Sequence, residues 1–173
     1  METVILPHLP DHPLHICLFT HVQNAHFLRQ QLLDGNVDFE YAFLDAAMIL
    51  SRQHVLSACF RAINDLLQSR LKSKNVHSEI VFSLSPNNNI AGAFRTFGVS
   101  ETTRDLLVVK VGGDQALIPD HLIKHVEGQM LRCTDEKLTQ LRDEGRMRKA
   151  YKVEIASPEA EAFIVGSMAL KGS

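Results

Sequence analysis

The stretch from Glu79 to Gly98, EIVFSLSPNNNIAGAFRTFG, is the most specific part of the sequence and decides the predicted fold. Ile80, Phe82 and Leu84 alternate as in a strand that faces a core, and Val81 makes this segment apolar on both faces. The spacing then changes to i, i+3, i+4 and i+7, which is typical of an amphipathic helix; these positions hold Ile90, Ala93, Phe94 and Phe97. We therefore predict a buried strand that leads through a turn into a helix, with Gly98 as its left-handed stop.

The turn between these two elements consists of Ser85, Pro86, Asn87, Asn88 and Asn89. Short Asn and Ser side chains accept hydrogen bonds from the free N–H groups of a first helical turn, so a capping role is favoured. A helix N-terminus can also hold an anion, such as the phosphate of a terminal nucleotide. The sequence leaves both roles open.

Other segments alternate between strand and helix patterns along the chain. The predicted strands are His15 to Thr20, Leu106 to Val111 and a short edge strand within Gly128 to Cys133. The predicted helices are Ala25 to Leu33 with Asn24 as cap, Arg52 to Leu71 with Ser51 as cap, Pro119 to Val126, and Lys137 to Arg142. We predict a single α+β domain over residues 1–173, with a central mixed or largely antiparallel sheet of about four strands and helices on both faces.

The C-terminal segment predicts one more helix, starting at Ser157, Pro158 and Glu159 and running to about Leu170. Its apolar residues do not form one stripe. One side holds Ala160, Phe163, Ile164 and Met168, and the other holds Ala162, Val165 and Ala169. Such a helix is either buried between its neighbours or forms a protein interface. The predicted interface residues are Phe163, Ile164, Val165, Met168 and Ala169.

A basic segment, Arg70, Lys72 and Lys74, lies where the long predicted helix ends. Cations at a helix C-terminus offset the helix dipole, and they also suit contact with phosphate, so both roles are open. A second basic cluster, Arg142, Arg146, Arg148 and Lys149, is diluted by acidic residues and indicates a solvated loop.

Composition limits the possible functions. The formal net charge is −2, which argues against indiscriminate nucleic-acid binding and restricts any RNA contact to a local patch. Cys17, Cys59 and Cys133 are few and far apart, which favours reduced thiols in the core over disulfides. Because we find no long apolar run and no secretion signal, we expect a soluble intracellular protein without membrane contact.

Catalytic patterns are absent from the sequence, which lacks nucleotide-binding glycine loops, a nucleophile elbow and zinc-protease motifs. His8, His12 and His15 crowd a proline-rich segment, but no further ligands lie at metal-binding spacing. His121 and His125 share a helix face without a third ligand. We predict no catalytic residue, no metal and no cofactor.

Several quoted segments together resemble a known family. The run LSPNNNI with the following helix, the strand LLVVKV at 106–111, CLFTHVQNAHFLR at 17–29, LKSKNVHSEI at 71–80 and RKAYKV at 148–153 are similar to the small non-catalytic subunit of the KEOPS (EKC) complex. This subunit is a kinase-binding protein, and the resemblance covers essentially the whole chain.

The resemblance implies a role in threonylcarbamoyladenosine modification of tRNA. It implies direct binding to the small atypical kinase of the complex through the C-terminal helix, indirect association with the remaining subunits, and help in recruiting the tRNA 3′ end. For that role, the residues that we predict from the basic segment and the Asn turn are Arg70, Lys72, Lys74, Asn87, Asn88 and Asn89. It also implies nuclear and cytoplasmic localisation and a link to telomere maintenance. The alternative is a small stand-alone enzyme with an unrecognised His or Cys site.

Overall fold

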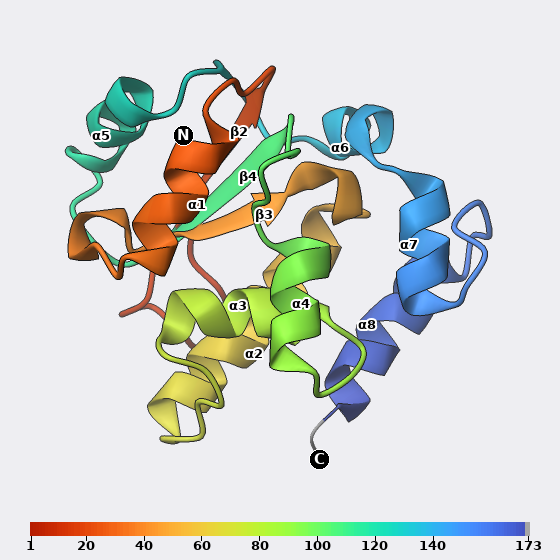
Figure 1. The fold of residues 1–173 in the computed structure, drawn as a ribbon. Coiled ribbons are helices and arrows are strands. Elements are labelled where there is room, and N and C mark those ends of the chain that lie inside the picture. The colour runs from red at the N-terminus through yellow and green to blue at the C-terminus, as the bar shows by residue number, and fades with distance from the viewer. Residues whose placement is uncertain (172–173) are drawn as a thin grey trace.

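The computed structural model describes residues 1–171 and is built around one antiparallel sheet (Figure 1). The strands β1 (Glu2–Val4), β2 (Leu14–Thr20), β4 (Leu106–Val111) and β3 (Ala42–Asp45) lie in that order, and β5 (Gln129–Leu131) also pairs with β2. Every pairing is antiparallel. The predicted α+β class and largely antiparallel sheet are therefore confirmed.

Strand β2 is buried at all seven positions because helices cover both faces of the sheet. Leu14, Ile16 and Leu18 face one core, whereas Cys17 and Phe19 face a second core on the opposite side. The first core is shared with α2 (Arg52–Leu67), α3 (Val76–Leu84), α6 (Asp135–Leu141), α7 (Glu144–Tyr151) and α8 (Ala160–Leu170), and the second with α1 (Ala25–Leu33) and α5 (Ile118–His125). Figure 1 shows these two helical layers on either side of the strands.

The predicted strand over 80–84 is wrong, because these residues form the C-terminal half of helix α3. The helix begins with a capping box in which Asn75 accepts from the Ser78 backbone and Ser78 accepts from the Asn75 backbone. From Glu79 to Leu84 every side chain is buried, so no polar face marks the helical period. An all-round buried helix and a buried strand look alike over so short an apolar run.

Helix α4 (Ile90–Phe97) is found where it was predicted, but its ending differs. Gly98 has an extended backbone with φ −82°, so the predicted left-handed stop is wrong. A Cβ atom at this position would lie 2.8 Å from the carbonyl oxygen of Phe94. The glycine is therefore required by close approach and not by its backbone angle.

Smaller differences concern element ends. Helix α2 ends at Leu67 instead of Leu71, and Ser69 then takes a positive φ of 55°. Asn24 precedes α1 but does not cap it; its side chain bonds the backbone of His125 and Glu127.

The second basic cluster lies largely on helix α7 and not in a loop. Strands β1 and β3 were not predicted, because runs of three and four residues are too short to show an alternating pattern.

Two buried histidines join the helices to the rest of the domain. His54 accepts from the Leu50 backbone at Nδ1, so Nε2 carries the proton and donates to Tyr151, whose hydroxyl donates to the carbonyl of Leu84. His77 on α3 accepts from the backbone N–H at the end of β4, at 3.0 Å. Both imidazoles must be neutral to accept these bonds.

We predict that the two histidines make the fold sensitive to acid. Burial lowers the pKa of His54 to about 3, and burial together with the Lys110 charge lowers the pKa of His77 to about 3. The unfolded chain takes up protons below about pH 6.5 that the folded chain refuses, so stability is lost as the pH falls from about 6.5 toward 3. Each histidine contributes a slope of up to about 1.4 kcal/mol per pH unit.

Urea unfolding at pH 7.5, 6 and 5 measures this slope. The variant His77→Gln should reduce it, whereas His8→Gln, at an exposed position, should leave it unchanged. Equal slopes for His77→Gln and the wild type would contradict the assignment.

Candidate functional site

Helix α8 presents one face to the core and an apolar face to solvent. Ala160, Ile164 and Met168, four residues apart, are buried. On the outside, Phe163 is 51% exposed and Leu170 is 77% exposed. The other accessible apolar residues are small or half-buried, namely Ala162, Val165, Gly166 and Ala169, and the polar residues Glu161 and Ser167 are accessible as well.

The five predicted interface residues therefore divide into two groups. Ile164 and Met168 belong to the chain's own core and hold the helix in place. Phe163, Val165 and Ala169 remain accessible to a partner. The helix begins two residues after Pro158, its predicted first helical residue, because Ser157 closes a turn on Glu159 before regular hydrogen bonding starts at Ala160. The interface role of these residues stays a prediction.

The C-terminal end of α8 is fixed by two cations. Arg61 of α2 donates to the carbonyls of Met168 and Lys171. The buried ammonium of Lys171 donates to the carbonyl of Phe82 at the end of α3 and lies 3.8 Å from the centre of the Phe82 ring. Burial lowers the pKa of Lys171 to about 8, with the Arg61 charge acting in the same direction. These bonds give the exposed face of α8 a defined orientation on the domain.

The basic segment lies in the loop between α2 and α3 and is anchored by Glu79. The buried Glu79 carboxylate accepts from the backbone N–H groups of Lys72 and Ser73 at 3.0 and 2.9 Å, and from the Ser73 hydroxyl. Arg70 forms an ion pair with Asp65 at 3.3 Å, which offsets its charge. The loop is thus an ordered platform.

The Asn turn lies at the other end of α3. Asn89 caps α4 by accepting from Gly92 N–H at 2.9 Å, and Asn87 accepts from the backbone N–H of Asn89 at 3.0 Å. The capping role predicted for the turn is therefore found. Nine residues of α3, a length of about 13 Å, separate the turn from the basic loop. The structure does not bring the two predicted halves of the tRNA site together.

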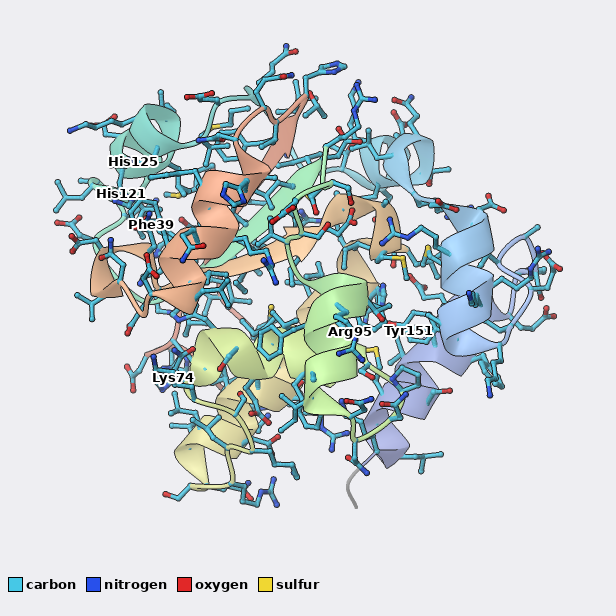
Figure 2. The ribbon with its side chains drawn as sticks, viewed as in Figure 1. Phe39, Lys74, Arg95, His121, His125 and Tyr151 are labelled. Atoms are coloured by element: carbon cyan, nitrogen blue, oxygen red, sulfur yellow. The ribbon has the colours of Figure 1, made fainter. Side chains whose placement is uncertain are left out.

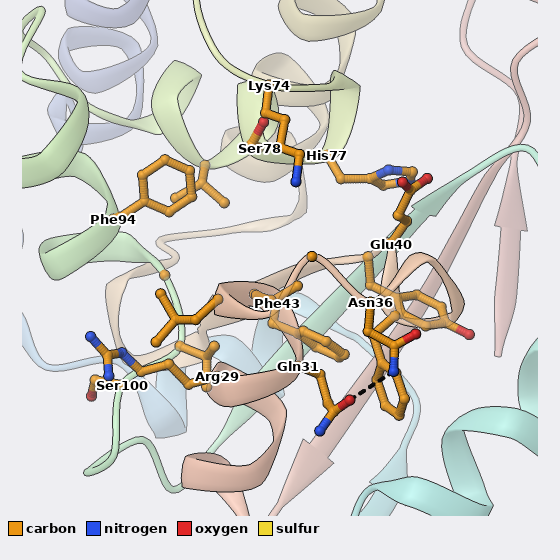
Figure 3. Close-up of a pocket in the computed structure, with 18 of the residues that line it drawn as sticks. Arg29, Gln31, Asn36, Glu40, Phe43, Lys74, His77, Ser78, Phe94 and Ser100 are labelled. Carbon is orange, nitrogen blue, oxygen red and sulfur yellow. Dashed lines mark hydrogen bonds between the residues drawn. The ribbon is translucent and has the colours of Figure 1, made fainter.

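Lys74 instead lies beside a cavity of about 690 Å³ between α1, α3, α4 and the edge of β3. Figure 3 shows the Lys74 ammonium extending into this space and Arg29 on the opposite wall beside Ser100. Arg95 of α4 adds a third cation to the lining (Figure 2). Glu101 is 4.0 Å from Arg29 and offsets part of this charge.

The interior of the cavity is apolar and partly aromatic. Tyr41, Phe43, Phe94, Val81 and Val99 contribute to its walls. Burial raises the pKa of Tyr41 to about 12, so this ring stays neutral near physiological pH. Aromatic rings beneath a cationic rim suit a flat, partly apolar group that carries phosphate, such as an unpaired nucleotide.

Sequence reasoning missed Arg29 and Arg95. Arg29 lies on a short amphipathic helix and Arg95 in the last turn of α4, where single arginines are common. The sequence pattern did mark the basic loop residues, but of these only Lys74 lines the cavity. The remaining lining residues come from segments far apart in sequence, so no local pattern marks them.

The second basic cluster is largely neutralised. Arg142 pairs with Glu144, Arg146 with Asp45 and Arg148 with Glu154, at 3.3, 3.2 and 3.8 Å. Paired cations on an exposed helix make a poor phosphate site compared with the cavity rim.

Thiol and metal chemistry gain no support within residues 1–171. The three cysteines are buried, as predicted, and burial raises the pKa of Cys59 to about 12 and those of Cys17 and Cys133 to about 11. Neutral buried thiols are poor nucleophiles. In the same range, no three potential ligands among His, Cys, Asp and Glu gather as a metal site, and none of the described helices is long and apolar enough to span a bilayer.

One protein-family model matches most of the chain. Residues 19–172 match the family model described as "Kinase binding protein CGI-121". The chain belongs to the CGI-121 family. Among curated CGI-121 relatives, the "EKC/KEOPS complex subunit cgi121" of Aspergillus fumigatus is 50% identical, covering 100% of this chain and 97% of the relative. The protein of the same name from Schizosaccharomyces pombe is 37% identical, covering 98% of this chain and 99% of the relative. The family resemblance inferred from the motifs is confirmed.

We predict that Glu79 controls the order of the basic loop in this CGI-121 protein. The variant Glu79→Ala should lower stability by about 1–3 kcal/mol, because two backbone N–H groups lose a buried charged acceptor. Hydrogen exchange at Lys72 and Ser73 should accelerate. The control Glu127→Ala, at an exposed side chain, should change stability by less than about 0.5 kcal/mol. Unchanged exchange at both amides in Glu79→Ala would refute the anchoring role.

Proposed function

We propose that this chain is a non-catalytic subunit of an EKC/KEOPS complex, acting in the nucleus and cytoplasm, that binds the small kinase of the complex and helps recruit tRNA for threonylcarbamoyladenosine modification. The observation that carries the proposal is the exposed apolar face of α8 in a member of a kinase-binding family. The full-length similarity to EKC/KEOPS subunits supports the choice of complex.

The α8 surface suits a protein partner because it combines large and small apolar residues. Phe163 and Leu170 can fill pockets of the kinase, and the small residues Ala162, Gly166 and Ala169 allow its backbone to approach closely. Ile164 and Met168 contribute indirectly by anchoring the helix. A firmly held helix binds with less loss of conformational entropy than a mobile one.

Regulation of the kinase requires only that α8 binds one of its conformations more tightly. A subunit with such differential affinity shifts the population of active kinase without contacting the nucleotide. The proposed subunit therefore needs no catalytic group of its own.

For tRNA, we propose that the cavity lined by Lys74, Arg29 and Arg95 holds an unpaired end of the RNA. Bases would stack on the aromatic walls, and the three cations would contact the backbone phosphates. An unpaired 3′ end fits a cavity of about 690 Å³ better than a duplex does, because a duplex keeps its bases stacked and paired.

The alternative of a stand-alone enzyme has weaker support. His77 is the one histidine in the lining of the cavity, its Nε2 is already used by the end of β4, and burial together with Lys110 lowers its pKa to about 3. A general base needs a pKa nearer to neutral and a free lone pair.

We predict that Phe163→Glu and Leu170→Glu each weaken kinase binding at least about tenfold, because a charge would be buried in an apolar interface. Isothermal titration calorimetry with the purified small kinase of the same organism measures the change. Thermal unfolding should be nearly unchanged, since both side chains are exposed.

The matched control is Ile123→Glu, which changes a 60% exposed isoleucine on α5. Helix α5 lies on the opposite side of the molecule from α8 (Figure 1), so kinase affinity should be retained. Equal affinity for wild type and both α8 variants would remove this surface from the proposal.

We also predict that Lys74→Glu combined with Arg95→Glu weakens tRNA binding. The slope of log affinity against log salt should become shallower by about 0.7 for each single-strand phosphate that the variant no longer neutralises. Filter binding across salt concentrations, with intact tRNA and with tRNA that lacks its unpaired 3′ nucleotides, measures both effects.

Lys137→Glu, which reverses an exposed charge on α6, serves as the control and should change affinity little. The double variant should also lose the preference for intact tRNA over shortened tRNA. A preference that persists in the double variant would place the RNA-binding site elsewhere.

A further inference from the structure

The Asn turn over 85–89 lies beside the end of α8, although the two are far apart in sequence. The bond from Lys171 to the Phe82 carbonyl ties the C-terminal end of α8 to the last turn of α3. Tyr151, from α7, bonds the carbonyl of Leu84, the last residue of α3. The turn begins at the next residue, and Figure 1 shows it running between α4 and α8.

Two of the three asparagines already have structural roles inside the turn. Asn87 and Asn89 accept backbone hydrogen bonds and shape the entry into α4. Asn88 is exposed, and its side chain forms no hydrogen bond within residues 1–171. Its amide group is therefore available to a partner.

Exposed apolar residues follow Asn88 in the sequence and also lie at the end of the neighbouring α8. Ile90, two residues later, is 37% exposed, and Ala91 is exposed as well. On the neighbouring α8, Leu170 is 77% exposed. An amide at the edge of an apolar patch is the arrangement found at protein interfaces, where a polar rim surrounds an apolar centre.

The charges favour a protein over RNA at this end of α3. No Lys, Arg or His lies between His77 and Arg95 in the sequence, and Lys171 is buried with its ammonium already bonded. The N–H groups of Asn89 and Gly92, which could otherwise donate to a phosphate, are taken by the Asn87 and Asn89 side chains. The N–H groups of Ile90 and Ala91 at the start of α4 remain open, but residues 78–94 supply no cation to a phosphate bound there.

We propose that Asn88 and Ile90 extend the kinase-docking face of α8 onto the Asn turn, with Asn88 as a polar contact at its edge and Ile90 as part of its apolar area. The inference rests on the proposed kinase binding. The partner is the kinase, and RNA contact by Asn88 is the competing outcome. The turn thus has two roles: Asn87 and Asn89 hold its shape, and Asn88 contacts the kinase.

The test compares Asn88→Asp with Asn88→Arg, which introduce opposite charges at one exposed site. At a protein interface both charges are buried without a partner, so both variants should weaken kinase binding about tenfold and leave tRNA affinity unchanged. At a phosphate contact, Asn88→Arg would strengthen tRNA binding and Asn88→Asp would weaken it. That opposite pattern, with kinase affinity unchanged, overturns the inference.

Two further variants separate this inference from the proposed function. Gln115→Glu, an exposed amide before α5, controls for charge alone and should leave kinase affinity unchanged. Phe163→Glu reports on α8. Loss of kinase binding in Phe163→Glu but not in either Asn88 variant rejects the Asn88 contact alone, whereas retained binding in all of them rejects the α8 surface too. A wild-type chain that fails to bind the kinase rejects both.

Discussion

The buried helix α3 is the constraint on which the rest of the structure depends. Its N-terminal half supplies Glu79, which fixes the basic loop through the Lys72 and Ser73 backbones. Its C-terminal carbonyls accept from Lys171 and Tyr151, which fixes the ends of α8 and α7. Removing water from these groups is favourable only because each finds a partner, so the helix and its neighbours are ordered together.

The same burial explains why α3 was mistaken for a strand. Sequence patterns reveal a helix through the contrast between an apolar and a polar face, and α3 has no polar face from Glu79 to Leu84. The one local helix signal was the capping box of Asn75 and Ser78, which precedes the apolar run. By contrast, α1, α2 and β4 were located closely, because Asn24 and Gly35 bound α1, Ser51 caps α2 and β4 is a largely apolar run.

Packing also limited how much of the candidate surfaces could be predicted from the sequence. An apolar α8 could be predicted from composition, but which residues face the core depends on its packing against α2 and α3. Ile164 and Met168 are buried in the core, whereas Phe163 and Leu170 are exposed to solvent. The cavity could not be predicted, since Arg29, Lys74 and Arg95 come from three separate elements. Its cations converge only after α1 and α3 have packed on opposite faces of the sheet.

The separation of the two surfaces along α3 has a mechanical consequence. Lys74 lies at one end of the helix, and the Asn turn and the end of α8 lie at the other (Figure 2). Under the proposed function, the kinase and the RNA end would therefore bind different residues and would not compete for the same ones. Because the side chains of α3 from Glu79 to Leu84 are buried, bending this part of the helix would disturb the packed core. Under the proposed function, the fold of α3 would then set the separation between the kinase and the RNA end.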